Sequence, residues 1–285
     1  MALHHVESVV RPATLGEAWA AKQSSGKAAR FVGGGIDIVL YTPSTVSTLI
    51  DLKGLDLSGV REESAAISIG ATATMTEAIE SPALAAYAGG FLVRVLREVA
   101  SPLQRNLATI GGTIGSAHPW SDVIPALLAL DADLAVYDGE ERTIPLRAYL
   151  DGRRGDASPI ICAIHLPLGL ASARGALASF TRTGFDVALL NVACLGRVVD
   201  GAWADVRIVI GGTPGLAARQ GAAEDALTGK PATSETIALA AETAAAAIDA
   251  RDDLRASAEY RRTLARVLVE RCLTEIAGGP EGGTR

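Results

Sequence analysis

Cysteine and histidine are scarce in this sequence of 285 residues, which contains three of the first and four of the second. The cysteines stand far apart at Cys162, Cys194 and Cys272, so no pair has the spacing of a metal-binding motif or of a disulfide framework. Each lies among apolar residues, as is typical of small buried side chains. We therefore expect no metal site in this chain, and any iron–sulfur cluster would need its ligands from another chain.

An excess of positive charge is also absent, since 26 Lys and Arg stand against 32 Asp and Glu for a net charge of −6. This balance excludes the basic surface that nucleic acids or anionic membranes require. No apolar run reaches the length of a membrane span, because Glu242 and Asp249 interrupt the longest candidate, residues 237–250. Residues 1–10 show no secretory signal pattern. We expect a soluble, cytoplasmic protein with no membrane span and no nucleic-acid partner.

What the sequence does contain is an alternation of short strand patterns and helix patterns without an internal repeat. The motif Thr14-Leu-Gly-Glu17 predicts a capped helix start. Strands are predicted at residues 29–32, 48–52, 66–70, 132–137, 142–145, 160–167, 176–180, 187–197 and 206–211. Further helices are predicted at residues 75–80, 90–100, 121–130, 234–250 and 257–277. With small residues at 169–175 as a linker, this order predicts an α+β protein of two lobes followed by a helix-ended domain.

Two glycine-rich segments are the candidates for a functional site. Phe31–Asp37 reads F-V-G-G-G-I-D, and Asn106–Ser116 reads N-L-A-T-I-G-G-T-I-G-S. Adjacent glycines let successive N–H groups point into one concavity, where they can bind a phosphate. Neither segment matches the Rossmann fingerprint or the P-loop, because Ile38 stands where a glycine is needed and the second segment has no lysine. The residues alone leave two interpretations open, a phosphate cradle and a pair of tight turns.

Several short motifs appear along the chain in a recognisable order. They are Arg11-Pro12, Gly33-Gly-Gly-Ile-Asp37, Leu49-Ile-Asp-Leu52, Ile69-Gly-Ala71, Arg105-Asn-Leu-Ala-Thr-Ile-Gly-Gly112, Pro119-Trp-Ser-Asp122, Asp186-Val-Ala188 and Asp253-Leu-Arg-Ala-Ser-Ala-Glu-Tyr-Arg261. This order resembles the FAD-binding medium subunit of the molybdenum hydroxylases, the family of carbon monoxide dehydrogenase, 4-hydroxybenzoyl-CoA reductase and xanthine dehydrogenase. The resemblance extends from about residue 10 to residue 277, and it is most specific between residues 105 and 133.

The resemblance implies a two-lobed FAD-binding domain of the PCMH/VAO type, residues 1–172 with lobes 1–57 and 58–172. A C-terminal flavoprotein domain of a small antiparallel sheet plus helices would follow at residues 173–285. The resemblance also implies an oxidoreductase subunit that passes electrons from iron–sulfur clusters of a partner through FAD to an external acceptor. The expected partners are an iron–sulfur small subunit with 2Fe-2S clusters and a large subunit with the molybdopterin cofactor, in a dimer of heterotrimers (a heterohexamer).

The same resemblance implies an FAD held between the two lobes, with both glycine-rich segments around its pyrophosphate. The implied cofactor-binding residues are Phe31, Val32, Gly33, Gly34, Gly35, Ile36, Asp37, Thr109, Gly111, Gly112, Thr113, Gly115, Ser116, His118, Asp122, Ile160, Ile161 and Thr181. Asp122 would accept a hydrogen bond from a ribityl or ribose hydroxyl, and helix capping is its alternative role. Ile160 and Ile161 would lie along the flavin or belong to the core. No side chain is expected to be catalytic in its own right.

Four positions depart from the family pattern. Ile36 stands where Thr, His or Asn is usual, Thr113 where Asn is usual, and Thr181 where a lysine near the flavin is usual. His118 replaces a small residue. The departures at Ile36, Thr113 and Thr181 keep open the alternative of a scaffold subunit whose flavin pocket has degenerated. A flavoprotein that acts without molybdenum partners is a further alternative.

Overall fold

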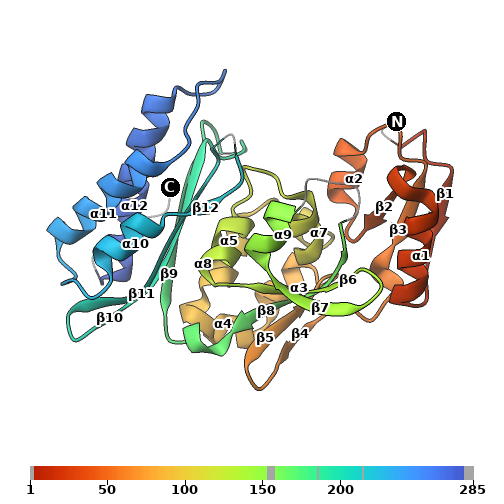
Figure 1. The fold of residues 1–285 in the computed structure, drawn as a ribbon, viewed down its shortest axis with the longest axis horizontal. Helices are drawn as coiled ribbons and strands as arrows, with labels where there is room; N and C mark the ends of the chain where they lie inside the picture. The colour runs from red at the N-terminus through yellow and green to blue at the C-terminus, as the bar shows by residue number, and fades with distance from the viewer. Residues whose placement is uncertain (1–2, 153–157, 185, 214, 279–285) are drawn as a thin grey trace. The chain divides into compact units, whose positions relative to one another are not determined.

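The computed structural model describes residues 3–152, 158–184, 186–213 and 215–278 (Figure 1). The backbone divides into two compact units, each assembled from three segments of the chain. Unit 1 consists of Met1–Leu84, Arg97–Ser116 and Asp131–Leu168, and unit 2 of Ala85–Leu96, Ala117–Leu130 and Gly169–Arg285. Among the described residues, no helix is both long enough and apolar enough to cross a lipid bilayer.

The first part of unit 1 is a three-stranded parallel sheet with the order β1-β3-β2, drawn in red and orange in Figure 1. Its strands are β1 (Ser8–Val10), β2 (Ala29–Val32) and β3 (Thr48–Asp51), and its helical segments are α1 (Leu15–Ser25), η1 (Gly26–Ala28), α2 (Ile36–Tyr41) and η2 (Leu52–Gly54). Thr14 caps α1, because its Oγ1 accepts a hydrogen bond from the Glu17 N–H at 3.1 Å. The Glu17 carboxylate accepts from the N–H of Ala13 and not from that of Thr14, so the predicted cap forms with a one-residue offset.

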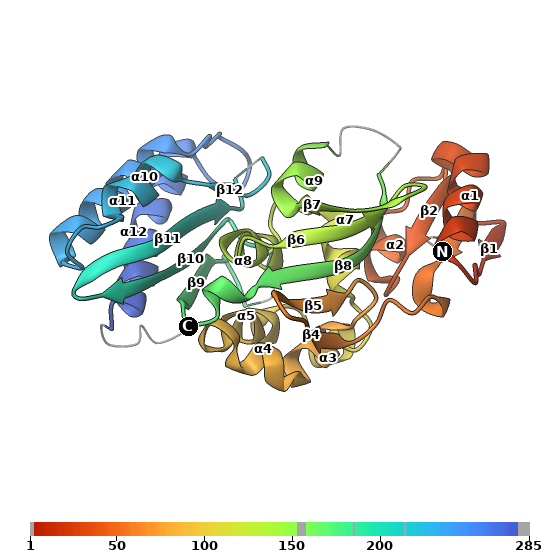
Figure 2. The same ribbon diagram turned by 60° about the horizontal axis from the view of Figure 1, so that its bottom comes forward.

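The second part of unit 1 is a five-stranded antiparallel sheet with the order β4-β5-β8-β6-β7, which Figure 2 shows most openly. Its strands are β4 (Val60–Glu62), β5 (Ala66–Gly70), β6 (Asp133–Tyr137), β7 (Glu141–Pro145) and β8 (Ile160–Pro167). The helices of this part are α3 (Met75–Glu80), α6 (Pro102–Arg105), α7 (Ile110–Ser116) and α9 (Leu146–Gly152), and α4 (Pro82–Ala86) begins in unit 1 and ends in unit 2.

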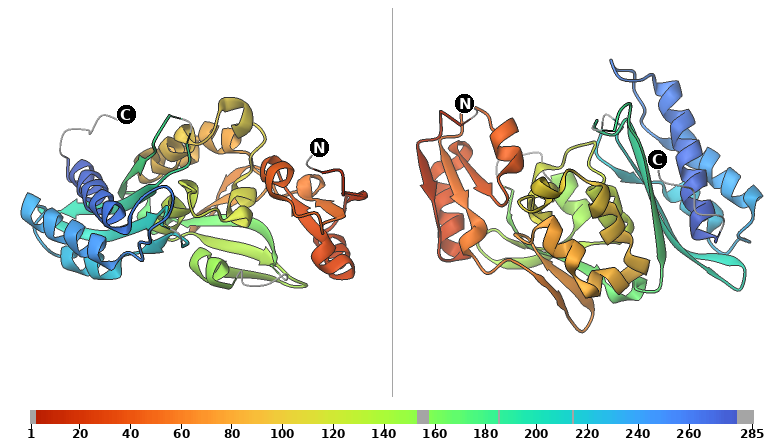
Figure 3. Two further views of the ribbon diagram at one scale, coloured as in Figure 1. Left: turned by 90° about the horizontal axis from the view of Figure 1, so that it is seen from above. Right: turned by 180° about the vertical axis from the view of Figure 1, so that it is seen from behind.

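Unit 2 is built on a four-stranded antiparallel sheet with the order β12-β11-β10-β9. Its strands are β9 (Arg174–Phe180), β10 (Leu190–Val199), β11 (Ala202–Gly211) and β12 (Ala218–Arg219). Its helices are η3 (Tyr87–Gly90), α8 (Val123–Ala129), α10 (Gly221–Leu227), α11 (Ser234–Ala247) and α12 (Ala258–Ile276), and it contains most of α5 (Phe91–Glu98) and of η4 (Leu168–Leu170). Helices α10, α11 and α12 cover one face of this sheet (Figure 3). Burial of apolar surface stabilises that layer by about 25 cal/mol per Å².

Most of the predicted elements form, but the second glycine-rich segment folds differently from the loop that its composition suggests. Residues 110–116 form helix α7, in which Ile110 and Ile114 lie one turn apart and are fully buried. A Cβ on Gly111 would lie 2.6 Å from the carbonyl oxygen of Ala71, so glycine lets α7 approach the preceding chain closely. The glycines of this segment therefore serve close packing of a helix, at the usual cost in helix propensity.

Candidate functional site

The first glycine-rich segment turns the chain from β2 into α2. Gly35 has φ +81°, a left-handed conformation that strongly favours glycine, and it caps the first turn of α2. A pocket of about 110 Å³ lies beside this turn, lined by Val9, Val32, Gly33, Gly34, Gly35, Leu49, Asp51 and Lys53. It is located at the carboxyl ends of the parallel strands, which is where ligands bind in many open parallel sheets.

The second glycine-rich segment packs directly on this turn within unit 1. A Cβ on Gly34 would lie only 1.8 Å from the carbonyl oxygen of Leu107, and one on Gly33 would lie 2.6 Å from Oγ1 of Thr109. A Cβ on Gly112 would lie 2.7 Å from the same Thr109 hydroxyl. Unit 1 thus brings Gly33, Gly34, Thr109 and Gly112 together, and glycine is required at each closest approach.

The two segments differ in how many of their backbone N–H groups already donate a hydrogen bond within the protein. At the start of α7, the N–H groups of Ile110 and Gly111 donate to carbonyl oxygens of Ala73 and Ala71, and that of Gly112 donates to Oγ1 of Thr109 at 3.1 Å. Among the described residues, no backbone carbonyl accepts a hydrogen bond from the N–H of Gly34 or Gly35. The unpaired donors of the site therefore belong to the first segment, while the second one supplies close backbone packing and an exposed Gly112.

An arginine and an asparagine that precede Thr109 hold this segment in place. Nη1 of Arg105 donates to the carbonyl oxygens of Arg97, Val99 and Ala100, each at 2.9 Å. Oδ1 of Asn106 accepts a hydrogen bond from Oγ1 of Thr76 at 2.6 Å. The motif that precedes the glycines is thus a structural support, and the sequence pattern does not show which carbonyl and hydroxyl groups it binds.

The remaining candidates of unit 1 belong either to these two segments or to strand β8. Phe31, Val32, Ile36, Asp37, Thr113, Gly115 and Ser116 are all half-buried. The Thr113 hydroxyl donates to the carbonyl oxygen of Thr109 at 3.1 Å, so this donor already has an acceptor. Ile160, on β8, packs in the core cluster with Ala18 and Ile50, which agrees with the core role left open for it, and Ile161 is also buried.

Three candidates, His118, Asp122 and Thr181, lie in unit 2. Asp122 occupies the N-cap position of α8 but makes no capping hydrogen bond with its side chain. Instead, its Oδ1 accepts a hydrogen bond from Nδ2 of Asn191 at 2.8 Å. Burial raises the pKa of Asp122 above its usual value, and hydrogen bonds from Asn191 and Ser179 oppose part of that rise. A half-buried carboxylate in such surroundings is a frequent feature of functional sites.

The other two candidates of unit 2 lie in connecting segments. His118 precedes α8 and stacks on Trp120, with 4.7 Å between the ring centroids and 10° between the planes. Thr181 follows β9 and is half-buried. The segment after it is held by Arg255, whose Nη2 donates to Oδ2 of Asp186 at 3.0 Å and to the carbonyl oxygen of Val187 at 2.6 Å.

A second arginine, Arg261 of α12, supports the same part of unit 2 from inside the core. Only 2% of it is exposed, and its Nη1 donates to the carbonyl oxygens of Leu189 and Gly212. Its Nη2 pairs with Oδ2 of Asp253 at 2.6 Å. Backbone N–H groups of Ala256 and Arg255, together with Arg261, lower the pKa of Asp253 to about 2. These contacts give both arginines structural roles.

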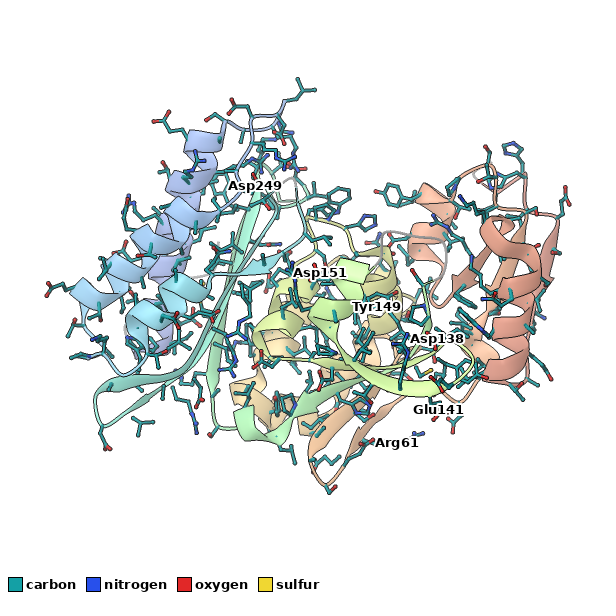
Figure 4. All side chains as sticks on the ribbon, viewed as in Figure 1. Arg61, Asp138, Glu141, Tyr149, Asp151 and Asp249 are labelled. Carbon is teal, nitrogen blue, oxygen red and sulfur yellow. The ribbon has the colours of Figure 1, made fainter. Side chains whose placement is uncertain are left out.

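Among the described residues, no three His, Cys, Asp or Glu side chains come together as a metal site. The acidic residues labelled in Figure 4 lie in different places: Asp138 in the turn between β6 and β7, Glu141 on β7, Asp151 on α9 and Asp249 in the segment after α11. Unit 1 instead contributes backbone donors at a glycine turn beside a tightly packed helix, and unit 2, described by itself, contains the Asp122 carboxylate. Backbone donors of this kind suit a phosphate-containing ligand, and such a ligand must bring its own reactive group.

Comparison with known sequences defines the class of protein to which this fold and site belong. Residues 4–169 match the FAD binding domain in molybdopterin dehydrogenase, and the chain therefore belongs to that family. More particularly, residues 176–276 match the C-terminal domain of the carbon monoxide dehydrogenase flavoprotein. The resemblance inferred from the motifs and the predicted α+β fold class are both confirmed.

Individual relatives match over most of the chain. The carbon monoxide dehydrogenase medium chain of Hydrogenophaga pseudoflava is 28% identical, over 92% of this chain and 94% of the relative. The nicotine 6-hydroxylase medium subunit of Paenarthrobacter nicotinovorans is 29% identical, over 83% of each chain. In the solved structure of the carbon monoxide dehydrogenase from Hydrogenophaga pseudoflava, one chain superimposes with a TM-score of 0.89, covering 96% of this chain and 98% of that chain.

Proposed function

We propose that this chain is the FAD-binding medium subunit of a molybdenum hydroxylase, an oxidoreductase complex in which electrons leave iron–sulfur clusters of a partner and reach an external acceptor through FAD. The observation that carries the proposal is the direct backbone contact between the two glycine-rich segments of unit 1. Gly34 lies so close to Leu107 that no other residue fits. This contact occurs in a chain that matches the FAD-binding family over residues 4–169.

The residues present suit a dinucleotide cofactor. Gly34 and Gly35 offer N–H donors to a pyrophosphate, and the exposed Gly112 of α7 lets a ligand approach the helix backbone closely. Asp122 offers an acceptor to a sugar or ribityl hydroxyl. FAD, when bound, supplies the electron-transfer chemistry, and the protein supplies orientation and electrostatics. We assign the cofactor contacts to the whole set of residues that the resemblance implies, in a domain of residues 1–172 with lobes 1–57 and 58–172, followed by a domain of residues 173–285.

The expected attachment of FAD is noncovalent. Two of the three cysteines, Cys194 and Cys272, are buried in the core of unit 2, and Cys162 lies on β8. Burial raises the pKa of Cys162 to about 11, which keeps its thiol protonated and unreactive at neutral pH. Backbone donors and packing against glycine must then account for the affinity.

The partners in this proposal are an iron–sulfur small subunit and a large subunit with the molybdopterin cofactor, arranged as a dimer of heterotrimers in the cytoplasm. Support comes from the relatives, which are a medium chain of carbon monoxide dehydrogenase and a medium subunit of nicotine 6-hydroxylase. The substrate would bind to the large subunit, so the present chain does not identify it.

One observation favours a second candidate, a flavin-free scaffold subunit. The Thr113 hydroxyl already donates within α7, and Ile36 places an apolar side chain in the first turn of α2, so two polar contacts usual in the family are missing. Native purification of the chain with its partners tests both candidates. The proposal expects flavin absorbance in a complex with two further subunits, one of them rich in cysteine. Recovery of the same complex without flavin would favour the scaffold, and a fully active flavoprotein without partners would contradict the assembly.

A further inference from the structure

A fully buried asparagine stands in the middle of the unit 2 sheet. Asn191 is 0% exposed, and on β10 it alternates with Leu190 and Val192, which face the core under α10–α12. Its side chain therefore points to the opposite face, where α8 packs on β10 and β11. The register places it directly between Ser179 of β9 and Gly211 of β11.

The surroundings of Asn191 fix the orientation of its amide group. Nδ2 lies 2.8 Å from Oδ1 of Asp122 and 3.0 Å from the carbonyl oxygen of Ser121. Both of these groups accept hydrogen bonds, so the amide nitrogen and not the oxygen must face them. Oδ1 of Asn191 finds no hydrogen-bond partner among the described residues and points toward Gly211, where a Cβ would lie 2.4 Å away.

An unpaired buried acceptor is unfavourable, and an apolar residue of the same size would avoid that cost. Glycine at position 211 adds a second cost, because only glycine leaves room for the amide oxygen. Asn191 thus carries both of these unfavourable contributions, and its amide supplies the sheet with two N–H donors aimed at the start of α8. The donors therefore have a role that packing alone does not explain.

We infer that Asn191 is a positioning residue for cofactor binding, which orients the Asp122 carboxylate and maintains it as a hydrogen-bond acceptor for a hydroxyl of the dinucleotide. This inference rests on the proposed function, in which Asp122 contacts FAD. Ser179, the cross-strand neighbour of Asn191, assists from β9 with its hydroxyl.

Several charged groups on the elements around Asp122 have partners of their own. Helix α8 itself carries no ionisable side chain. Cys194 of β10 faces the core under α10–α12. The other ionisable groups on the packed strands and the preceding loop are Arg174 of β9, Arg197 of β10, Asp205 and Arg207 of β11, Arg219 of β12 and His118. Arg197 pairs with Asp205, Arg219 pairs with Glu224, and His118 stacks on Trp120. The acceptor state of Asp122 thus depends chiefly on burial and on the Asn191 and Ser179 donors.

The test is a double-mutant cycle on FAD affinity, measured by fluorescence quenching with the deflavinated full chain over a range of pH. The variants are Asn191→Leu, Asp122→Ala and their combination. Asn191→Leu should weaken FAD binding about 10- to 100-fold at neutral pH, the usual effect of losing a hydrogen bond to a charged group. In the Asp122→Ala background the same change should cost less than about threefold, because no carboxylate remains to be positioned.

The pH dependence of FAD affinity distinguishes a positioning role of Asn191 from a purely structural one, because a loss of stability alone would not shift it. The acid limb is the fall in FAD affinity as the pH is lowered and Asp122 becomes protonated. Loss of the Asn191 donor should shift this limb to higher pH, because the hydrogen bond that favours the carboxylate form of Asp122 is gone. Gln220→Ala is the matched control, since Gln220 is a buried amide of unit 2 whose Nε2 donates to the carbonyl oxygen of Ala218. It should lower thermal stability without moving the acid limb.

Equal losses of affinity in the wild-type and Asp122→Ala backgrounds would overturn the inference, as would an acid limb that does not move. A folded wild-type chain that fails to bind FAD would instead contradict the proposed function. If Asn191→Leu does not fold, Ser179→Ala replaces it, because Ser179 is exposed. That variant should shift the acid limb in the same direction by a smaller amount, and an unchanged limb would overturn the inference.

Discussion

Replacing Gly34 by alanine should disrupt the contact on which the candidate site depends. The added Cβ would lie 1.8 Å from the carbonyl oxygen of Leu107 and 3.1 Å from Cα of Ala108. Both obstacles are backbone atoms, so no side-chain rotation can relieve the clash, and the two segments must separate. Overpacking of this kind costs about 1–3 kcal/mol, and we place Gly34→Ala near 3 kcal/mol because the backbone itself must move.

The assay is thermal unfolding together with FAD titration of the deflavinated protein. A loss of about 3 kcal/mol lowers the Tm by roughly 6–12 °C at this size. FAD affinity should fall about 10- to 100-fold, since displaced N–H groups lose a hydrogen bond to a charged phosphate.

Gly16→Ala is the matched control for this prediction. Gly16 lies in α1, and its added Cβ would make only ordinary contacts, at 3.6 Å from Oη of Tyr137 and 3.9 Å from Oγ1 of Thr14. Alanine is better than glycine in a helix by up to about 1 kcal/mol, so the Tm should stay unchanged or rise. A Gly34→Ala variant with the wild-type Tm and the wild-type FAD affinity would refute the reasoning, because the two glycine-rich segments could not then be in contact.

Three further predictions concern unit 2. Arg261→Met should lower the free energy of unfolding by about 1–3 kcal/mol, because the carbonyl oxygens of Leu189 and Gly212 lose their donor, while Asp253 keeps two backbone N–H donors. Arg266→Met, at a half-exposed site, should change it by less than about 0.5 kcal/mol in chemical denaturation. The folded-state pKa of Asp253 is lowered from 3.8 to about 2. Its carboxylate therefore stabilises the fold at pH values above 3.8, and this contribution is lost as the pH falls from 3.8 toward about 2. The stability difference between wild type and Asp253→Asn should accordingly narrow over that range, and a constant difference would contradict the assignment. Thr181→Lys should raise the two-electron flavin potential by about 20–60 mV in spectroelectrochemical titration, since a nearby cation worth roughly 1–3 kcal/mol stabilises reduced flavin; an unchanged potential would mean that residue 181 does not face the ring.

The sequence predicts the elements whose signals are local. Strands β2, β5 and β8 and helix α3 have the predicted bounds, because alternating or helical apolar patterns are flanked by clear turn residues. Capping by Thr14 is likewise a local signal, and only the donor to the Glu17 carboxylate differs from the expected pattern, since it is the N–H of Ala13 and not that of Thr14. The family resemblance adds the order of the elements, which periodicity alone does not determine.

Helix α7 shows where local signals fail. Glycines at positions 111, 112 and 115 predict a loop by propensity, yet Ile110 and Ile114 bury one helical face. Tertiary packing outweighs propensity here, because the close approach to Ala71 is open only to glycine. No pattern within the segment itself contains that information.

The contacts that support the site were equally hidden in the sequence. Asn191 and Asp122 are 69 residues apart, and Arg261 reaches a carbonyl oxygen 72 residues before it. Such pairs depend on how the strands and helices pack, and a single sequence does not show which distant polar groups meet. The candidate residues could therefore be named from the motifs, but the residues that hold them could not.

The central claim is that this chain binds FAD noncovalently at the glycine turn of unit 1. The most direct measurement is the flavin content of the purified full chain, before and after acid precipitation, followed by titration of the stripped protein with FAD. The account predicts one FAD per chain, released completely by the acid and taken up again at the same stoichiometry, with Gly34→Ala deficient in uptake. A folded chain that contains no flavin and takes none up, or a flavin that stays attached to the precipitated protein, would contradict it.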